Sequence, residues 1–402
     1  GSNHVPIKLG NKADGEDFFD RVSEREDLWR YLEGNHIVLS GPRRLGKTSL
    51  LQRLAEEATE KGMLARLIDV EGIDTVDGFV AELDRAFPDD TIRGYLKTAG
   101  THVSGLLARF RKVEVKLPGG LGGGLELQAI PDTPWRSTAL NLQKRMSGAP
   151  LLVLIDEFSV YLEKLLVRDP ADAERLLGWL RAWRQQSGLA CRFLFSGSIG
   201  LNALLARHRL NTRFNDCHDF RLKPFKPAAA LAMLTEEARR EGWTPVGGSL
   251  DYLCQRIGWL SPFYLNLLLV TTIEAARDRL EEAGCTERQI QQSDVDDAYD
   301  RLLATRSRFI HWHQRLERDL GEPKLGFTMA ILAAVAKADE GLSRRQLLAR
   351  LQRLEANPDT CAERLDDAML LLEEDGYLDA GSERIRFLSF LLRDYWKRNH
   401  AR

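Results

Sequence analysis

The sequence lacks the features that mark secreted, membrane-spanning or strongly charged proteins. Its five cysteines are widely spaced without a Cys-x-x-Cys pair, so neither a disulfide framework nor a zinc site is predicted. There is no signal-peptide pattern, and the longest apolar run, near residues 262–272, is too short to cross a bilayer. The formal net charge is only −2, so nucleic-acid binding would need a local basic patch. These absences predict a cytoplasmic protein without a membrane partner.

What the chain does contain is the pattern of a parallel α/β sheet. Of its 402 residues, 44% are hydrophobic and 29% are charged, as in a globular protein of more than one domain. In the first part, short apolar segments alternate with amphipathic helical segments. Three of the candidate strands are near-continuous apolar runs, as expected of strands covered on both faces. The candidate strands are residues 36–40, 65–70, 151–155, 192–196 and 219–222.

A glycine-rich excursion lies between the second and third candidate strands. Residues 112–117 and 125–128 alternate with period two, and the loop 118–124 between them contains five glycines. This pattern predicts a β-hairpin that projects from the α/β core. A glycine-rich loop can contact phosphates, but this one has no lysine and no following helix. A structural or partner-contacting hairpin is therefore the favoured interpretation.

After residue 223 the sequence becomes helical almost throughout. Apolar spacing predicts helices over residues 227–242, 250–257, 262–283 and 293–320. From residue 323 the pattern indicates three helices followed by a short β-hairpin around residues 380–382. Ser343 is expected to cap the second of these helices and Thr360 the third. Helix–helix–helix–hairpin is the layout of a winged helix.

One segment carries a specific chemical signature. Gly41-Pro42-Arg43-Arg44-Leu45-Gly46-Lys47-Thr48 fits the pattern G-x-x-x-x-G-K-[ST], and it follows an apolar strand and opens the helical segment 48–59. Its glycines let backbone N–H groups turn toward phosphates, and the helix N-terminus adds a positive dipole end. We expect Lys47 to reach the β- and γ-phosphates of ATP and the Thr48 hydroxyl to ligate Mg²⁺. Ser49 completes the expected nucleotide-binding segment.

Two further polar elements follow buried strands. Asp156 and Glu157 come at the carboxyl end of the strand 151–155, where ligands bind in open α/β sheets. We expect Asp156 to hold Mg²⁺ through water and Glu157 to act as the general base on the attacking water. At the end of the next strand, Ser196 or Ser198 could orient that water. A simple strand-to-turn exit made of serine and glycine explains these two residues equally well.

These motifs predict the fold class and a domain layout. The class is α/β, with a P-loop NTPase parallel sheet in residues 1–222 and the hairpin excursion near residues 112–128. A helical lid follows in residues 223–322, and a winged-helix domain in residues 323–402.

The chain also resembles a known superfamily. Phe18-Phe19-Asp20-Arg21-Val22-Ser23-Glu24 is similar to the F-x-G-R-x-x-E box of origin-recognition and STAND-type ATPases, with Asp20 in place of the usual glycine. The P-loop, the Asp156-Glu157 pair and the segment after Ser196 look like those of prokaryotic, archaeal-type STAND and AAA-like ATPases. Gly258-Trp259-Leu260-Ser261-Pro262 is similar to their G-x-P lid motif but two residues longer.

The resemblance implies that ATP binds between core and lid. It further implies that Val22 contacts the adenine, that Pro262 contributes from the lid, and that the nucleotide state moves the winged helix. The leading hypothesis is a Mg²⁺- and ATP-dependent switch with slow hydrolysis. It would act on a protein partner supplied in trans or on the assembly of subunits. A homo-oligomer is one form that such an assembly could take.

The alternative hypothesis is a DNA-binding ATPase, an initiator or transposition-type loader that acts through the winged helix. The segment 360–375 would be its recognition helix, and it carries six acidic residues against Arg364 alone. Such a surface would be repelled by a phosphate-lined groove. Basic residues lie instead near the preceding helix, at Arg344, Arg345, Arg350 and Arg353, so weak nonspecific contact stays open. DNA is therefore not the favoured partner.

Overall fold

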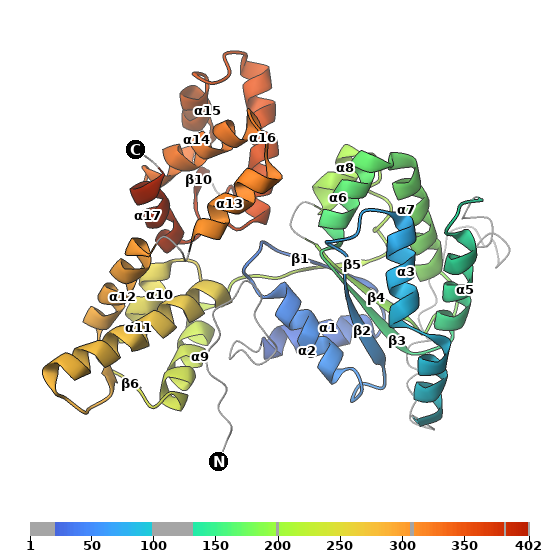
Figure 1. Ribbon diagram of the computed structural model, residues 1–402, viewed down its shortest axis with the longest axis horizontal. Helices are drawn as coiled ribbons and strands as arrows, with labels where there is room; N and C mark the ends of the chain where they lie inside the picture. The colour runs from blue at the N-terminus through green and yellow to red at the C-terminus, as the bar shows by residue number, and fades with distance from the viewer. Residues whose placement is uncertain (1–20, 99–131, 198–200, 306–308, 382, 401–402) are drawn as a thin grey trace. The chain divides into compact units, whose positions relative to one another are not determined.

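The computed structural model describes residues 21–98, 132–197, 201–305, 309–381 and 383–400 (Figure 1). The chain divides into two compact units. We call residues 21–41 and 47–222 the sheet unit, and residues 42–46 and 223–400 the helical unit. The loop 41–47, which carries the G-x-x-x-x-G-K pattern, is divided by this assignment: residues 42–46 fall in the helical unit, and Gly41 and Lys47 fall in the sheet unit.

A five-stranded parallel sheet organises the sheet unit. Its strand order is β2-β3-β4-β1-β5, with every neighbouring pair parallel. The strands are β1 (Ile37–Ser40), β2 (Leu64–Asp69), β3 (Leu151–Asp156), β4 (Arg192–Ser196) and β5 (His218–Arg221). All five strands predicted from the sequence are present, each within one residue at either end. β3 and β4 are buried along their whole length, which is why they appear as unbroken apolar runs.

Helices cover both faces of this sheet (Figure 1). α1 and α2 lie on one face, and α3, α5, α6 and α7 lie on the other. The helices are α1 (Val22–Leu32), α2 (Lys47–Glu57), α3 (Val76–Ala86), α5 (Arg136–Ser147), α6 (Phe158–Arg168), α7 (Pro170–Arg184) and α8 (Leu201–Arg207). Strands that run parallel need such crossover helices to return the chain to the same edge.

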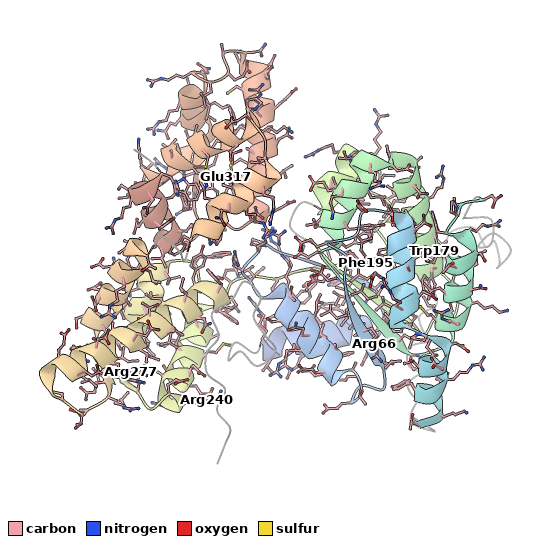
Figure 2. All side chains as sticks on the ribbon, in the orientation of Figure 1. Arg66, Trp179, Phe195, Arg240, Arg277 and Glu317 are labelled. Carbon is pink, nitrogen blue, oxygen red and sulfur yellow. The ribbon has the colours of Figure 1, made fainter. Side chains whose placement is uncertain are left out.

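Aromatic side chains fill the core beneath α6 and α7 (Figure 2). Trp179 and Trp183 stack with ring centroids 5.3 Å apart, and both pack in the core. Phe193 and Phe195 of β4 lie against Trp183 and Phe158 respectively. All five side chains are at most 1% exposed, so this packing holds the strand ends that carry the candidate site.

The first half of the helical unit consists of helices and one pair of two-residue strands. The helices are α9 (Pro227–Arg240), α10 (Ser249–Ile257), α11 (Pro262–Ala283) and α12 (Gln292–Ala304), and β6 (Thr244–Pro245) pairs in parallel with β7 (Gln289–Ile290). The single helix predicted over residues 293–320 is wrong. α12 ends at Ala304 because Thr305 takes an extended conformation with φ −93° and ψ 90°. A separate helix, α13, follows at Ile310–Asp319.

The second half of the helical unit combines helices with a three-stranded antiparallel sheet of order β8-β10-β9. The elements are α14 (Lys324–Ala336), β8 (Leu342–Ser343), α15 (Arg344–Leu351), α16 (Pro358–Glu374), β9 (Leu378–Asp379), β10 (Arg384–Phe387) and α17 (Phe390–Asn399). The hairpin β9–β10 lies where the sequence predicts it, and β8 adds a strand that was not foreseen.

Two cap predictions in this part have different outcomes. Ser343 caps α15 as predicted, and its hydroxyl accepts the Gln346 N–H at 3.1 Å. Thr360 is not the cap of α16. Asn357 takes that place, accepting the N–H groups of residues 359 and 360, because Pro358 forces an extended residue before it and then opens the helix.

Two further expectations from the sequence concern the glycine-rich hairpin and membrane-spanning helices. The hairpin predicted over residues 112–128 lies outside the described residues. Among the helices that the structure describes, none combines the length and the apolar character needed to cross a membrane.

Candidate functional site

The backbone of the phosphate-binding loop takes conformations that its glycines permit. Gly41 and Gly46 have positive φ angles of 149° and 86°. A Cβ atom on Gly41 would lie 3.0 Å from the carbonyl oxygen of Leu222, so the residue that follows β5 approaches the loop too closely for any side chain there. Arg44 also has a positive φ, 77°, which is strained for a non-glycine residue.

α2 begins at Lys47, directly after the loop. Lys47 is 7% exposed, and its Nζ donates to the Gly41 carbonyl oxygen at the start of the loop. The lysine side chain therefore turns back over the loop rather than out into solvent. Its positive charge and the N-terminus of α2 lie together, the arrangement that suits an anion.

Asp156 joins the phosphate-binding loop to the end of β3. The Thr48 hydroxyl donates to Asp156 Oδ2 at 2.7 Å, across 108 positions of sequence. Asp156 Oδ1 accepts the Ser196 hydroxyl at 2.9 Å and the backbone N–H of Glu157 at 3.0 Å. Asp156 is 1% exposed and Ser196 is fully buried. Because β3, β4 and β1 are neighbouring parallel strands, their carboxyl ends bring Ser196 and Thr48 to this one carboxylate.

Glu157 sits at the turn from β3 into α6. It is the N-cap residue of α6 and has a left-handed φ of 59°, and it is 9% exposed. A residue in this conformation changes the direction of the chain sharply.

The donor set at Thr48 and Asp156 fits Mg²⁺. A hydroxyl and a carboxylate are hard oxygen ligands, and Mg²⁺ in nucleotide sites is bound by one or two such groups together with phosphate oxygens and water. The structure's described residues include no cluster of three or more His, Cys, Asp or Glu that could hold a metal alone.

The other expected residues lie in different surroundings. Val22 is the first residue of α1 and is 48% exposed. Ser49 follows Thr48 in the first turn of α2. Pro262 opens α11, and its Cγ would lie 3.7 Å from a Cβ on Gly46. Ser198 lies outside the described residues.

Contacts of the loop residues 42–46 within the helical unit were not foreseen. The Arg43 guanidinium donates to Asp375 Oδ1 at 2.9 Å, and the Arg44 guanidinium lies 4.7 Å from the ring centroids of both Phe263 and Trp312. Burial lowers the pKa of Arg44 to about 10, so it remains charged at neutral pH. The sequence holds no signal for these pairs, because the partners are more than 200 residues from the loop.

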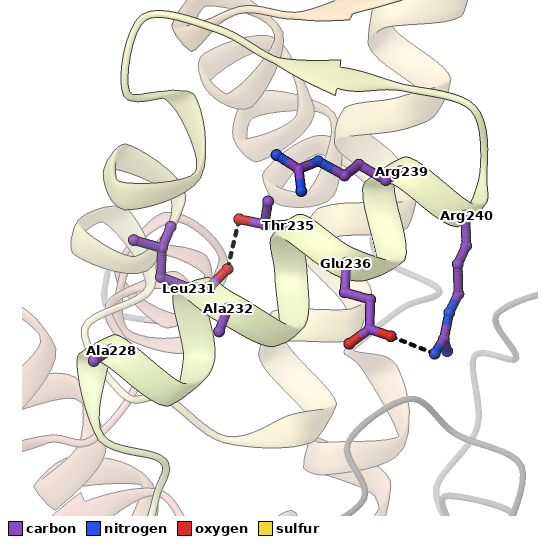
Figure 3. A pocket seen from close by; sticks show the side chains of 7 residues that line it. All are labelled: Ala228, Leu231, Ala232, Thr235, Glu236, Arg239 and Arg240. Atoms are coloured by element: carbon purple, nitrogen blue, oxygen red, sulfur yellow. Dashed lines mark hydrogen bonds and ion pairs between the residues drawn. The ribbon is translucent and has the colours of Figure 1, made fainter.

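A separate hollow of about 840 Å³ runs along the outer face of α9 (Figure 3). It is lined by Ala228, Leu231, Ala232, Thr235, Glu236, Arg239 and Arg240. Glu236 and Arg240 form an ion pair at its rim. None of the expected site residues borders this hollow.

The strand order, with the loop after β1 and the Asp156 carboxylate at the end of β3, defines a P-loop NTPase fold. A scan against protein-family models and a search of curated proteins found no match. Among solved structures, the chain is similar to the Walker-type ATPase PABY2304 of Pyrococcus abyssi. The identity is 16%, the match covers 97% of this chain and 99% of that chain, and the TM-score is 0.61. At this identity the likeness shows the fold alone.

Two more distant structures also match. The Aeropyrum pernix ORC2 protein is 16% identical over 96% of this chain and 92% of its own, with a TM-score of 0.49. The Thermotoga maritima RuvB Holliday junction branch migration motor is 15% identical over 91% of each chain, with a TM-score of 0.43.

Proposed function

We propose that this chain binds and hydrolyses Mg²⁺-ATP and passes its nucleotide state to a protein partner or an assembly. The observation that carries the proposal is the 2.7 Å hydrogen bond from Thr48 to Asp156. It places the end of a phosphate-binding loop beside a buried carboxylate at the carboxyl end of β3, as a shared Mg²⁺ site requires.

Each residue has a role in this proposal. Residues 41–49 cradle the phosphates, and Lys47 supplies the main positive charge. Thr48 and Asp156 hold Mg²⁺, which would neutralise charge on the phosphates. Glu157 accepts a proton from the attacking water. Because the Ser196 hydroxyl donates to Asp156, we assign Ser196 to fixing the orientation of that carboxylate rather than to the water itself.

The partner side of the proposal rests on the second half of the helical unit. Its helices and its three-stranded sheet support a winged helix, with α16 in the place of the recognition helix. The exposed residues of α16 include Glu363, Asp366 and Asp367, whose charges would repel a phosphate backbone. A protein partner is therefore the proposal, and duplex DNA bound through α16 is not.

Calorimetric titration with Mg²⁺-ATP tests the binding step. The wild-type chain should bind, and Lys47→Ala should not, because the phosphates lose their main cation while the loop remains. Lys164→Ala is the matched control, since Lys164 also donates to a backbone carbonyl, that of Glu71, but is exposed on α6. Equal affinity of wild type and Lys47→Ala would refute the assignment.

A further inference from the structure

Among the strands that the structure describes, β5 forms one edge of the parallel sheet. The N–H groups of His218 and Leu222 donate, each at 2.8 Å, to carbonyl oxygens in and next to β1. Because the backbone groups of a strand face its two sides alternately, the N–H and C=O groups of Asp219 and Arg221 face away from β1. Within the described part of the chain, no hydrogen bond reaches these four groups. The edge is therefore available to another strand.

The opposite edge of the sheet, β2, is protected in a way that β5 is not. The Leu64 N–H donates toward β3, so the backbone groups of Ala65 face outward. The Arg66 guanidinium donates to this outward carbonyl oxygen at 2.9 Å. Charged side chains placed on an edge in this manner discourage pairing with another chain. The side chains of Asp219 and Arg221 are exposed and form no ion pair with any described residue, so they leave their edge uncovered.

The two charges of β5 are arranged to fit a second copy of the same strand. In an antiparallel pair centred on Phe220, Asp219 lies opposite Arg221 of the second copy, and these residues exchange both of their backbone hydrogen bonds. Opposite charges directly across such a pair are stabilising, and like charges are destabilising. Centring the pair on Asp219 or on Arg221 would place two like charges opposite each other. The charge pattern thus selects one register.

The other face of β5 carries an aromatic contact in the same register. Phe220 is half-buried beside Tyr31 of α1, with ring centroids 6.3 Å apart, and Tyr31 stacks on His218 at 3.9 Å. The antiparallel pair brings Phe220 opposite Phe220 of the second copy at a position without hydrogen bonds, where side chains lie closest. Aromatic pairs are among the cross-strand pairs that stabilise a sheet. Both faces of the edge are therefore self-complementary.

We propose that β5 pairs with β5 of a second copy of this chain, antiparallel about Phe220, so that two five-stranded sheets become one continuous sheet. The same surface is used on both copies, and a two-fold axis relates them, so assembly through this edge closes at a dimer. The contact uses none of the groups assigned to phosphate or Mg²⁺ binding, and it forms without nucleotide.

Reversing one charge at a time tests the pairing. In sedimentation velocity over a concentration series, the nucleotide-free wild-type chain should dimerise. Asp219→Arg and Arg221→Asp should each weaken dimerisation by at least about tenfold, because each puts like charges opposite each other at two symmetric places. Arg85→Asp is the matched control. It reverses an exposed charge on α3 of the same unit, and dimerisation should not change.

Two rescues distinguish this register from any other contact between copies. A mixture of the two single variants again places opposite charges across the joined edge, so mixed dimers should form with nearly the wild-type affinity. The double variant Asp219→Arg/Arg221→Asp exchanges the two charges and should dimerise by itself. A monomeric wild-type chain, single variants that dimerise as wild type does, or a loss that neither the mixture nor the double variant restores would each overturn the proposal.

Discussion

Replacing Asp156 by asparagine probes the carboxylate on which the proposed Mg²⁺ site depends. Asp156 accepts three hydrogen bonds, from Thr48, Ser196 and the Glu157 N–H. An asparagine of the same shape keeps an acceptor for two of them, and the Thr48 hydroxyl can turn to accept from the new amide. Since a hydrogen bond to a charged group contributes about 1.5–3 kcal/mol, the free energy of unfolding should fall by only about 1–2 kcal/mol.

The effect on ligand binding should be much larger. A ligand at 100 times its Kd stabilises the folded state by about 2.7 kcal/mol. In a unit of the size of the sheet unit, that stabilisation raises Tm by roughly 5–10 °C. Asp156→Asn removes the negative charge that holds Mg²⁺, so most of the rise with Mg²⁺-ATP should disappear while the folded structure survives.

Thermal unfolding with and without Mg²⁺-ATP measures both effects. The control is Asp69→Asn, because Asp69 ends β2 directly beside Asp156 in the sheet register but is exposed. Asp69→Asn should keep the full rise in Tm. If Asp156→Asn showed a rise equal to that of wild type, Asp156 would not be part of a Mg²⁺ site.

Three further predictions concern stability and partners. Gly258→Ala should lower the free energy of unfolding by about 3 kcal/mol or more, because Gly258 has φ +76° and a Cβ there would lie 2.5 Å from the Phe390 ring. Gly148→Ala, with open space around it, should change stability by less than about 0.5 kcal/mol in the same thermal assay. Burial lowers the pKa of His36 from 6.5 to about 3. Between these two pH values, His36 is protonated in the unfolded chain but neutral in the folded chain. This linkage lowers the free energy of unfolding by up to about 1.4 kcal/mol per pH unit as the pH falls through this range. In urea titrations, the fall in the free energy of unfolding from pH 7.5 to pH 5.5 should therefore be smaller for His36→Gln than for wild type. Fluorescence anisotropy across a salt series should find no tight binding of duplex DNA. Tight, steeply salt-dependent binding that disappears when an arginine of β10 is replaced by glutamate would contradict the argument from the acidic surface of α16.

The sheet and the loop could be predicted because their signals are local. A strand buried on both faces leaves an apolar run such as residues 151–155, and its end is marked by the change to Asp156. The loop motif holds its glycines, lysine and threonine within eight positions, so no knowledge of the rest of the fold was needed to find it.

Other features depend on information that a local pattern does not contain. Residues 293–320 keep helical apolar spacing across the break at Thr305, so the spacing alone predicted one helix where there are two. The cap of α16 was misplaced because Thr360 is a common cap residue, although Asn357 before Pro358 is the stronger signal. The Arg43–Asp375 pair spans 332 positions, and nothing in either segment points to the other.

Phosphate release by Glu157→Gln, measured together with its affinity for ATP, tests the central claim most directly. Glutamine keeps the size of the side chain but cannot take a proton from water, so the variant should bind Mg²⁺-ATP as wild type does and release no phosphate. Glu163→Gln, exposed on the same helix, should hydrolyse ATP normally. Hydrolysis by Glu157→Gln at the wild-type rate would contradict the assignment of the base, and a wild-type chain that released no phosphate would contradict the ATPase itself.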